Sequence, residues 1–319
     1  MTNSTLQPVK IKSPLFEISH IVEELATVRK HWRHMHHRST EPGGRELPSP
    51  EALKKIMSDL RAVLFPMRLG PPELRQETEN FFVGHTLDAV LHSLLTQVRL
   101  ELSYVERSQP AEKISFEDHA LNIVRQFSQA LPSLRSLLDS DVIAAYRGDP
   151  AARSVDEVLL CYPGVLAMIY HRIAHQLHVL GASLLARIVA EISHTETGID
   201  IHPGAQIGPG FFIDHGTGVV IGETTIIGQR VRIYQAVTLG SKSFPTDGEG
   251  EIKKGIPRHP VVEDDVIIYA GATVLGRITI GRGAVIGGNV WITSDVAPGS
   301  HISQATLRHG VSLSEPMQI

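Results

Sequence analysis

An aliphatic residue recurs every six positions through the C-terminal part of the chain, and this spacing constrains the fold more than any other feature. The repeat is unbroken from 262 to 292, and two shorter sets precede it: Val262, Ile268, Val274, Ile280, Ile286 and Ile292, preceded by Ile201, Ile207, Ile213 and Val219 and then by Ile221, Ile227, Ile233 and Leu239. Neither an α-helix nor a plain strand has a period of six. This period is typical of a parallel β-helix, in which three hexapeptides form one triangular coil and stack their aliphatic side chains inside it.

The repeat is interrupted twice. The two earlier sets differ in register by two positions, which predicts a small insertion near residue 219. The segment SKSFPTDGEGEIKKGIPRHP, at 241–260, is rich in Gly, Pro and charged residues. Such a composition predicts a loop that leaves the coil. Loops on a rigid scaffold are common positions for binding groups.

The chain before about residue 195 has helical spacing instead. Apolar residues three and four positions apart predict helices at 15–35, 91–105 and 120–131, with the last interrupted at Pro132, and a further helical region at 155–192. The sequence therefore predicts an α+β protein with a helical N-terminal domain at 1–194, a β-helix at 195–300 that carries the loop at 241–260, and a C-terminal tail at 301–319.

Composition excludes several classes of protein. The 319 residues carry a net charge of −4 and no long basic run, so nothing indicates nucleic-acid binding. No apolar stretch is long enough to span a bilayer, and the N-terminal sequence is unlike a secretory signal. The single cysteine, Cys161, cannot form a disulfide within the chain, and we interpret it as a small apolar residue. We expect a cytoplasmic protein that binds neither nucleic acid nor membrane.

Asp200 and His215 are candidates for acid–base chemistry. They lie fifteen positions apart (215 − 200 = 15). A coil has about 18 residues, so one coil shortened at a corner would place the two side chains on neighbouring rungs. An Asp that holds a His orients the imidazole and raises its basicity, as a general base requires. The competing interpretation is a solvated histidine at a turn.

Other charged groups have the chemistry that an amino-acid substrate needs. A zwitterion requires carboxylates for its ammonium and a guanidinium for its carboxylate. Asp149, Asp214 and the Arg258-His259 pair could supply these groups. Each could equally be an ordinary surface charge. His171, His175 and His178 could share one helical face and bind a metal, or could simply be partly buried.

Six motifs of the chain resemble those of serine O-acetyltransferases, a family of hexapeptide-repeat enzymes. They are GDPAA at 148–152, YHRIAH at 170–175, GIDIHPGAQIG at 198–208, IDHGTGVVIGET at 213–224, VTLG at 237–240 and RHP at 258–260. The resemblance covers roughly residues 145–305, and the interval from Asp149 to His215 also fits the family. It implies that the β-helix is left-handed. It also implies transfer of an acetyl group from acetyl-CoA to the hydroxyl of L-serine, on the route to cysteine.

The resemblance also implies a role for each site residue, with acetyl-CoA as co-substrate and no permanently bound cofactor or metal. His215 matches the catalytic base and Asp200 its partner. The residues that match serine-binding positions are Asp149, Asp214, Glu223, Arg258 and His259. Those that match positions along the acetyl-CoA groove are Gly240, Ser241, Ala270 and Gly288.

Assembly and partners follow from the same resemblance. It implies a homotrimer or a dimer of trimers in which Arg258 and His259 reach a neighbouring subunit. It also implies feedback inhibition by L-cysteine. The terminal Ile319 matches a residue that inserts into O-acetylserine sulfhydrylase in this family, although a frayed terminus is the simpler interpretation. The loop at 241–257 is longer than in compact members, which leaves its role open.

Three alternatives remain at this point. A related acyltransferase could act on homoserine, O-phosphoserine, or a hydroxyl of a sugar or antibiotic. A metalloenzyme of the γ-carbonic-anhydrase type would use His202, His215 and His259 as zinc ligands. A non-catalytic scaffold of the cysteine synthase complex would need only the tail.

Overall fold

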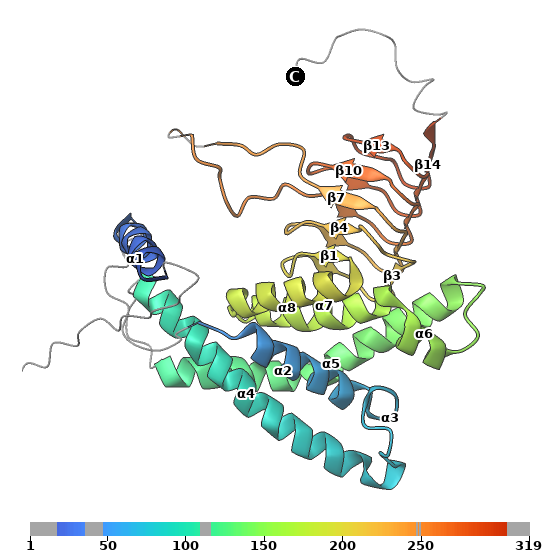
Figure 1. Ribbon diagram of the computed structural model, residues 1–319. Coiled ribbons are helices and arrows are strands. Elements are labelled where there is room, and N and C mark those ends of the chain that lie inside the picture. The colour runs from blue at the N-terminus through green and yellow to red at the C-terminus, as the bar shows by residue number, and fades with distance from the viewer. Residues whose placement is uncertain (1–17, 36–46, 109–115, 247, 249, 305–319) are drawn as a thin grey trace, which may run out of the picture. The chain divides into compact units, whose positions relative to one another are not determined.

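The computed structural model describes residues 18–35, 47–108, 116–246, 248 and 250–304 (Figure 1). The chain divides into two compact units, residues 1–46 and 47–319, and each is described by itself. The described part of the first unit is α1 (Ile18–Met35), which has no buried residue. Among the described helices of both units, none combines the length and apolar composition that a membrane span requires.

Seven α-helices and one 3₁₀ turn precede the coil in the described part of the second unit. They are α2 (Pro50–Leu64), α3 (Pro66–Leu69), η1 (Gln76–Thr78), α4 (Glu79–Ser108), α5 (Phe116–Gly148), α6 (Val155–Cys161), α7 (Pro163–Val179) and α8 (Ser183–Thr197). The Ser49 and Ser154 side chains cap α2 and α6 by accepting backbone N–H groups. Gly198, in the left-handed region with φ 69°, ends α8 just before the first strand.

The predicted interruption at Pro132 is wrong, because α5 continues through this residue. A proline inside a helix removes one backbone hydrogen bond and costs about 3 kcal/mol. Pro132 lies on the exposed side of α5. On the opposite side Phe127, Leu131 and Leu134 are buried. Packing of this apolar face therefore keeps the helix continuous.

A buried ion pair fastens the helices to the coil. Arg172 on α7 donates to both carboxylate oxygens of Asp141 on α5, each at 3.1 Å. The same guanidinium donates to the carbonyls of Ile207 and Gly208 in the first rung of the coil. Asp141 in turn accepts the backbone N–H of Phe211 at 2.9 Å. The position of the end of α5 against the coil is therefore fixed by charge-assisted hydrogen bonds.

The coil consists of very short strands, as the period of six predicts. They are β1 (Asp200–Ile201), β2 (Gln206–Ile207), β3 (Phe212–Ile213), β4 (Val220–Ile221), β5 (Ile226–Ile227), β6 (Arg232–Ile233), β7 (Thr238–Gly240), β8 (Val261–Val262), β9 (Ile267–Ile268), β10 (Thr273–Leu275), β11 (Thr279–Ile280), β12 (Val285–Ile286), β13 (Trp291–Ile292) and β14 (His301–Ile302). They pair in parallel into sheet A (β1-β4-β7-β10-β13), sheet B (β11-β8-β5-β2) and sheet C (β14-β12-β9-β6-β3). Figure 1 shows the strands stacked in successive rungs beyond α7 and α8. The predicted β-helix is confirmed.

The aliphatic residues of the repeat point into the coil and are buried. A second buried column lies two positions before most of them and includes Phe211, Val231 and Val237. Val219, which sequence spacing groups with Ile213, belongs to this second column because it lies two positions before Ile221 on β4. The extra residues therefore lie between 213 and 219.

This insertion lengthens one turn of the coil. The turn from β3 to β4 spans 214–219, whereas the equivalent turns span 234–237 and 269–272. The longer turn carries Asp214 and His215, and His215 has a left-handed φ of 58°. The loop at 241–260 lies between β7 and β8, and Figure 1 shows it extending away from the coil.

Candidate active site

The charged residues singled out in the sequence gather at two different corners of the coil. The first, here the histidine corner, joins sheet C to sheet A and contains Asp149, Asp214 and His215. The second, here the arginine corner, joins sheet A to sheet B and contains Glu223, Thr224, Arg258 and His259. Five steps along the chain, from residue 218 to residue 223, lead from one corner to the other. At about 3.3 Å per residue this distance is of order 15 Å.

At the histidine corner the imidazole is accessible and its neighbouring carboxylate is not. The His215 side chain is 72% exposed, whereas that of Asp214 is 11% exposed. His215 Nε2 lies 3.9 Å from Asp214 Oδ1. The other oxygen of Asp214, Oδ2, accepts a hydrogen bond from Arg232 at 2.7 Å. The corner therefore presents a free ring beside a fixed carboxylate.

Asp149 follows the last residue of α5 and faces the same corner. Its Oδ2 accepts the Tyr162 hydroxyl at 2.5 Å, and its Oδ1 accepts the backbone N–H of Ala151 at 2.8 Å. These hydrogen bonds, helped by the charges of Arg232 and His215, lower the pKa of Asp149. The hydrogen bond to Asp149 is also the main reason that the pKa of Tyr162 rises to about 12. Asp149 is therefore an oriented anion at neutral pH.

The predicted Asp200–His215 contact is not formed in this structure. Asp200 lies on β1 in register with Val220, and the described residues show no hydrogen bond between Asp200 and His215. The turn that carries His215 does pack on this rung, because Gly216 lies directly against the Ile199 side chain. The pair therefore stays a prediction.

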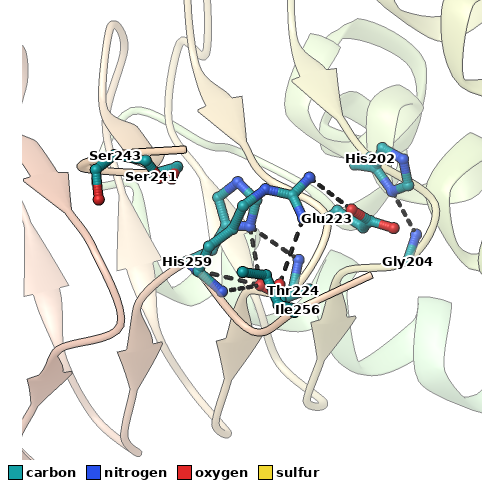
Figure 2. Close-up of polar contacts among 9 residues, drawn as sticks. His202, Gly204, Glu223, Thr224, Ser241, Ser243, Ile256 and His259 are labelled. Carbon is teal, nitrogen blue, oxygen red and sulfur yellow. Dashed lines mark hydrogen bonds and ion pairs between the residues drawn. The ribbon is translucent and has the colours of Figure 1, made fainter. Parts of the chain in front are cut away.

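The arginine corner is tightly hydrogen-bonded, as Figure 2 shows. Arg258 Nη2 donates to Glu223 Oε2 at 2.6 Å. The Thr224 hydroxyl oxygen accepts the backbone N–H groups of Arg258 and His259 at 2.9 and 3.1 Å. The backbone N–H of Thr224 donates to His259 Nδ1 at 3.1 Å. Because Nδ1 accepts, the proton of the neutral ring lies on Nε2.

Burial opposes charge at this corner. It lowers the pKa of His259, and the adjacent Arg258 lowers it further. Burial disfavours ionisation of Glu223, but the hydrogen bond and charge of Arg258 outweigh it, so the pKa of Glu223 is lowered. Burial also lowers the pKa of His202, beside Glu223, to about 4. At neutral pH the corner therefore holds a charged Arg–Glu pair beside neutral imidazoles.

The residues expected along the acetyl-CoA groove are divided between the same two corners. Ala270 and Gly288 lie at the corner of His215, two and three rungs further along, and the backbone N–H of Asn289 donates to the Ala270 carbonyl at 2.9 Å. Gly240 ends β7 and Ser241 follows it at the arginine corner, one rung beyond Gly222. Ser241 Oγ donates to the Ser243 carbonyl at 2.8 Å (Figure 2). Each corner of one chain thus carries part of both expected binding sites.

His171, His175 and His178, the candidate metal-binding histidines of α7, each have different surroundings. His171 is buried, which holds its pKa well below the usual value. His175 Nδ1 hydrogen-bonds to the Pro203 carbonyl at 2.8 Å, and the His178 ring packs edge-on against His202. Within the described segments, no group of three or more His, Cys, Asp or Glu side chains is arranged to hold a metal ion.

Sequence reasoning missed three residues that shape the two corners. Tyr162 fixes Asp149, Thr224 organises the arginine corner, and Arg232 binds Asp214. Thr224 is adjacent to Glu223, so its position in the chain was a usable signal. Arg232 occupies an outward position of a two-residue strand, where nothing in the sequence distinguishes it from a solvated charge.

Comparison with known proteins agrees with this architecture. Residues 259–294 match the sequence family described as bacterial transferase hexapeptide (six repeats). A plasmid-encoded serine acetyltransferase of Synechococcus elongatus is 61% identical over 265 residues, which are 82% of this chain and 83% of that protein. The chain belongs to the serine acetyltransferase family. Its fold class is helices followed by a left-handed β-helix of hexapeptide repeats.

Other serine acetyltransferases align as well. That of Mycobacterium tuberculosis is 52% identical over 158 residues, which are 50% of this chain and 65% of that protein. Among solved structures, serine acetyltransferase 1 of Entamoeba histolytica in complex with L-cysteine is 36% identical, with a TM-score of 0.68. The match covers 89% of this chain and 99% of that one.

Proposed function

We propose that the protein transfers the acetyl group of acetyl-CoA to the hydroxyl of L-serine, giving O-acetylserine and CoA for cysteine biosynthesis. Membership of the serine acetyltransferase family supports the reaction. The observation that carries the substrate is the division of charge: carboxylates with an accessible imidazole at one corner, and a guanidinium with a neutral imidazole at the other. A zwitterionic amino acid needs both sets.

The roles follow from the geometry of each corner. Asp149 and Asp214 would bind the serine ammonium, since both carboxylates are held in place by their own hydrogen bonds. Arg258 and His259 would bind the carboxylate, with Glu223 orienting the guanidinium. Gly240, Ser241, Ala270 and Gly288 would line the acetyl-CoA groove, since all four lie at the two corners.

His215 would act as the general base in a direct attack. It would accept the hydroxyl proton as the serine oxygen attacks the thioester carbonyl, and it would return a proton to the CoA thiolate when the tetrahedral intermediate collapses. Such assistance is typically worth about 10²- to 10⁴-fold in rate. Asp200 would hold the imidazolium after the ring rotates toward β1.

The histidine corner and the arginine corner lie about 15 Å apart on one chain. They cannot both bind the same serine molecule, because serine is shorter than that gap. We therefore propose a trimer, alone or paired into a dimer of trimers, in which the histidine corner of one copy meets the arginine corner of the next. Mixing His215→Ala chains with His259→Ala chains tests this. Random assembly of a cyclic oligomer places both intact corners at about a quarter of the interfaces, so about 25% of wild-type activity should return. Two variants of low activity that gain no activity when mixed would refute the shared site.

L-cysteine and O-acetylserine sulfhydrylase are the further partners that we propose. Solved serine acetyltransferases are described in complex with cysteine, and cysteine could occupy the serine site because it carries the same charged groups. Ile319 and the tail that would enter the sulfhydrylase lie outside the described residues. Deleting 310–319 should abolish co-elution with the sulfhydrylase, and persistence of the complex would refute the role of the tail. A cytoplasmic location is part of the proposal.

The test of the reaction is CoA release from acetyl-CoA in the presence of a series of acceptors. Release with L-serine well above that with homoserine, O-phosphoserine or a sugar would support the proposal. Preference for another hydroxyl would identify a related acyltransferase. No release from folded protein that still binds the sulfhydrylase would identify a scaffold.

A further inference from the structure

Arg232 connects the two segments that carry the carboxylates of the histidine corner. It lies on β6, one rung beyond β3 and in register with Phe212. Its Nη1 donates to the Gly148 carbonyl at 2.6 Å, and its Nη2 donates to Asp214 Oδ2 at 2.7 Å. Gly148 ends α5 and immediately precedes Asp149. One guanidinium therefore holds Asp214 directly and the backbone beside Asp149 at the same time.

The position of this guanidinium is itself well defined. Arg232 Cζ lies 4.9 Å from the centre of the Phe212 ring and 4.7 Å from that of Tyr234. The side chain is 23% exposed. A planar guanidinium that stacks on rings and donates from two nitrogens keeps one orientation. A lysine ammonium would lose both the stacking and the two fixed in-plane donors. The side chain is thus suited to fix other groups.

Arg232 and His215 also share one neighbour, the Asp214 carboxylate. The Asp214 carboxylate lies between Arg232 on one oxygen and the His215 ring on the other. Among the described residues, other titratable groups around this corner are Asp149 after α5, Tyr162 before α7, Asp200 on β1 and Tyr234 after β6. Glu157 acts on Tyr162, and Tyr269 stacks on Tyr234. A carboxylate shared with an arginine stabilises a neighbouring imidazolium less than an unpaired carboxylate does.

We propose that Arg232 is a positioning residue for the acetyl transfer: it holds Asp214 and the end of α5 in place and limits the pull of Asp214 on the His215 proton. This inference rests on the proposed function, because it assigns Asp149, Asp214 and His215 to one reaction. In this proposal Arg232 contacts neither the substrate nor the reacting atoms.

The experiment compares Arg232→Gln, Arg232→Lys and Arg230→Gln with the wild type. Arg230 is a matched control, since it is the same residue type two positions earlier and pairs with Asp265, at 2.6 and 2.9 Å, away from the histidine corner. For Arg232→Gln we expect kcat/KM for serine to fall at least about tenfold, since misplacement by about 1 Å can cost 10²-fold. We also expect the acid limb of its pH profile to move to higher pH, because the positive charge beside Asp214 is gone.

The other two variants separate charge from position. Arg232→Lys should lose activity but keep the acid limb near that of the wild type, because the charge remains. Arg230→Gln should keep kcat/KM within about twofold of the wild type and leave the acid limb unchanged. A folded Arg232→Gln protein with an unchanged kcat/KM and acid limb would overturn the proposal. A variant that loses activity, keeps the acid limb of the wild type and melts at a lower temperature would also overturn it. Arg232 would then contribute to stability alone.

A second readout does not depend on turnover. The His215 imidazole, assigned by comparison with His215→Ala, can be titrated by NMR in the wild type and in Arg232→Gln. Its midpoint should move to higher pH in Arg232→Gln and stay in place in Arg230→Gln. An inactive wild type would refute the proposed function, yet the titration would still show whether Arg232 acts on His215. An unmoved midpoint would overturn the inference.

Discussion

Gly222→Ala should disable the arginine corner through a single methyl group. Gly222 follows β4, and a Cβ built there would lie 2.0 Å from His259 Cδ2 and 2.1 Å from its Nε2. Carbon atoms in contact are about 3.5–4.0 Å apart, so the ring must move by about 1.5 Å. A displacement of about 1 Å can cost about 10²-fold in rate. We expect kcat/KM for serine to fall about 100-fold, or about 2.7 kcal/mol, mostly through KM.

The assay is CoA release at varied serine, with two comparisons. Gly248→Ala adds the same methyl in the loop at 241–260, where nothing lies within 4 Å, and should stay near wild type. In a His259→Ala background, Gly222→Ala should cost nothing further, because the methyl then has no ring to displace. An unchanged kcat/KM in Gly222→Ala would refute the reasoning. So would a Gly222→Ala effect that is as large in the His259→Ala background as in the wild type.

Two further predictions concern stability. Arg172→Met leaves the buried Asp141 carboxylate without its partner and should lower the free energy of unfolding by about 3–5 kcal/mol. The double variant Arg172→Met with Asp141→Leu should recover part of this loss. Equal denaturant midpoints for the single and the double variant would contradict this prediction. The pKa of His202 falls to about 4 on folding, so between about pH 6.5 and pH 4 the unfolded chain binds more protons than the folded one and stability falls as the pH falls. The melting temperature of His202→Gln should therefore drop less than that of the wild type over this window, and identical drops would count against the shift.

The sequence predicts the coil well because its period is a direct consequence of the structure. Every sixth side chain points inward, so residues such as Ile207 and Ile268 must be apolar and the pattern survives in the sequence. Four helical regions are also predicted from spacing, but α2 (Pro50–Leu64) is not. The effect of Pro132 is not predicted correctly either, because the buried face of α5 outweighs one lost hydrogen bond. The division into domains at 194 and 300 stays a prediction.

The site is less visible in the sequence than the scaffold. The lengthened turn at 214–219 marks the histidine corner, since a break in a strict repeat predicts a special turn. That His215 and His259 lie at different corners follows only from closure of the coil. Arg232 could not be found, because its partner Gly148 lies 84 positions earlier and the ends of α5 and β6 meet only through tertiary packing.

The most direct test of the account is CoA release from acetyl-CoA with L-serine by the wild type and by His215→Ala. The account predicts serine-dependent release that falls at least about 100-fold in the variant, the contribution of a general base, while its melting temperature stays near that of the wild type because the ring is exposed. Serine-dependent release that survives in His215→Ala would contradict the central claim that this imidazole is the base.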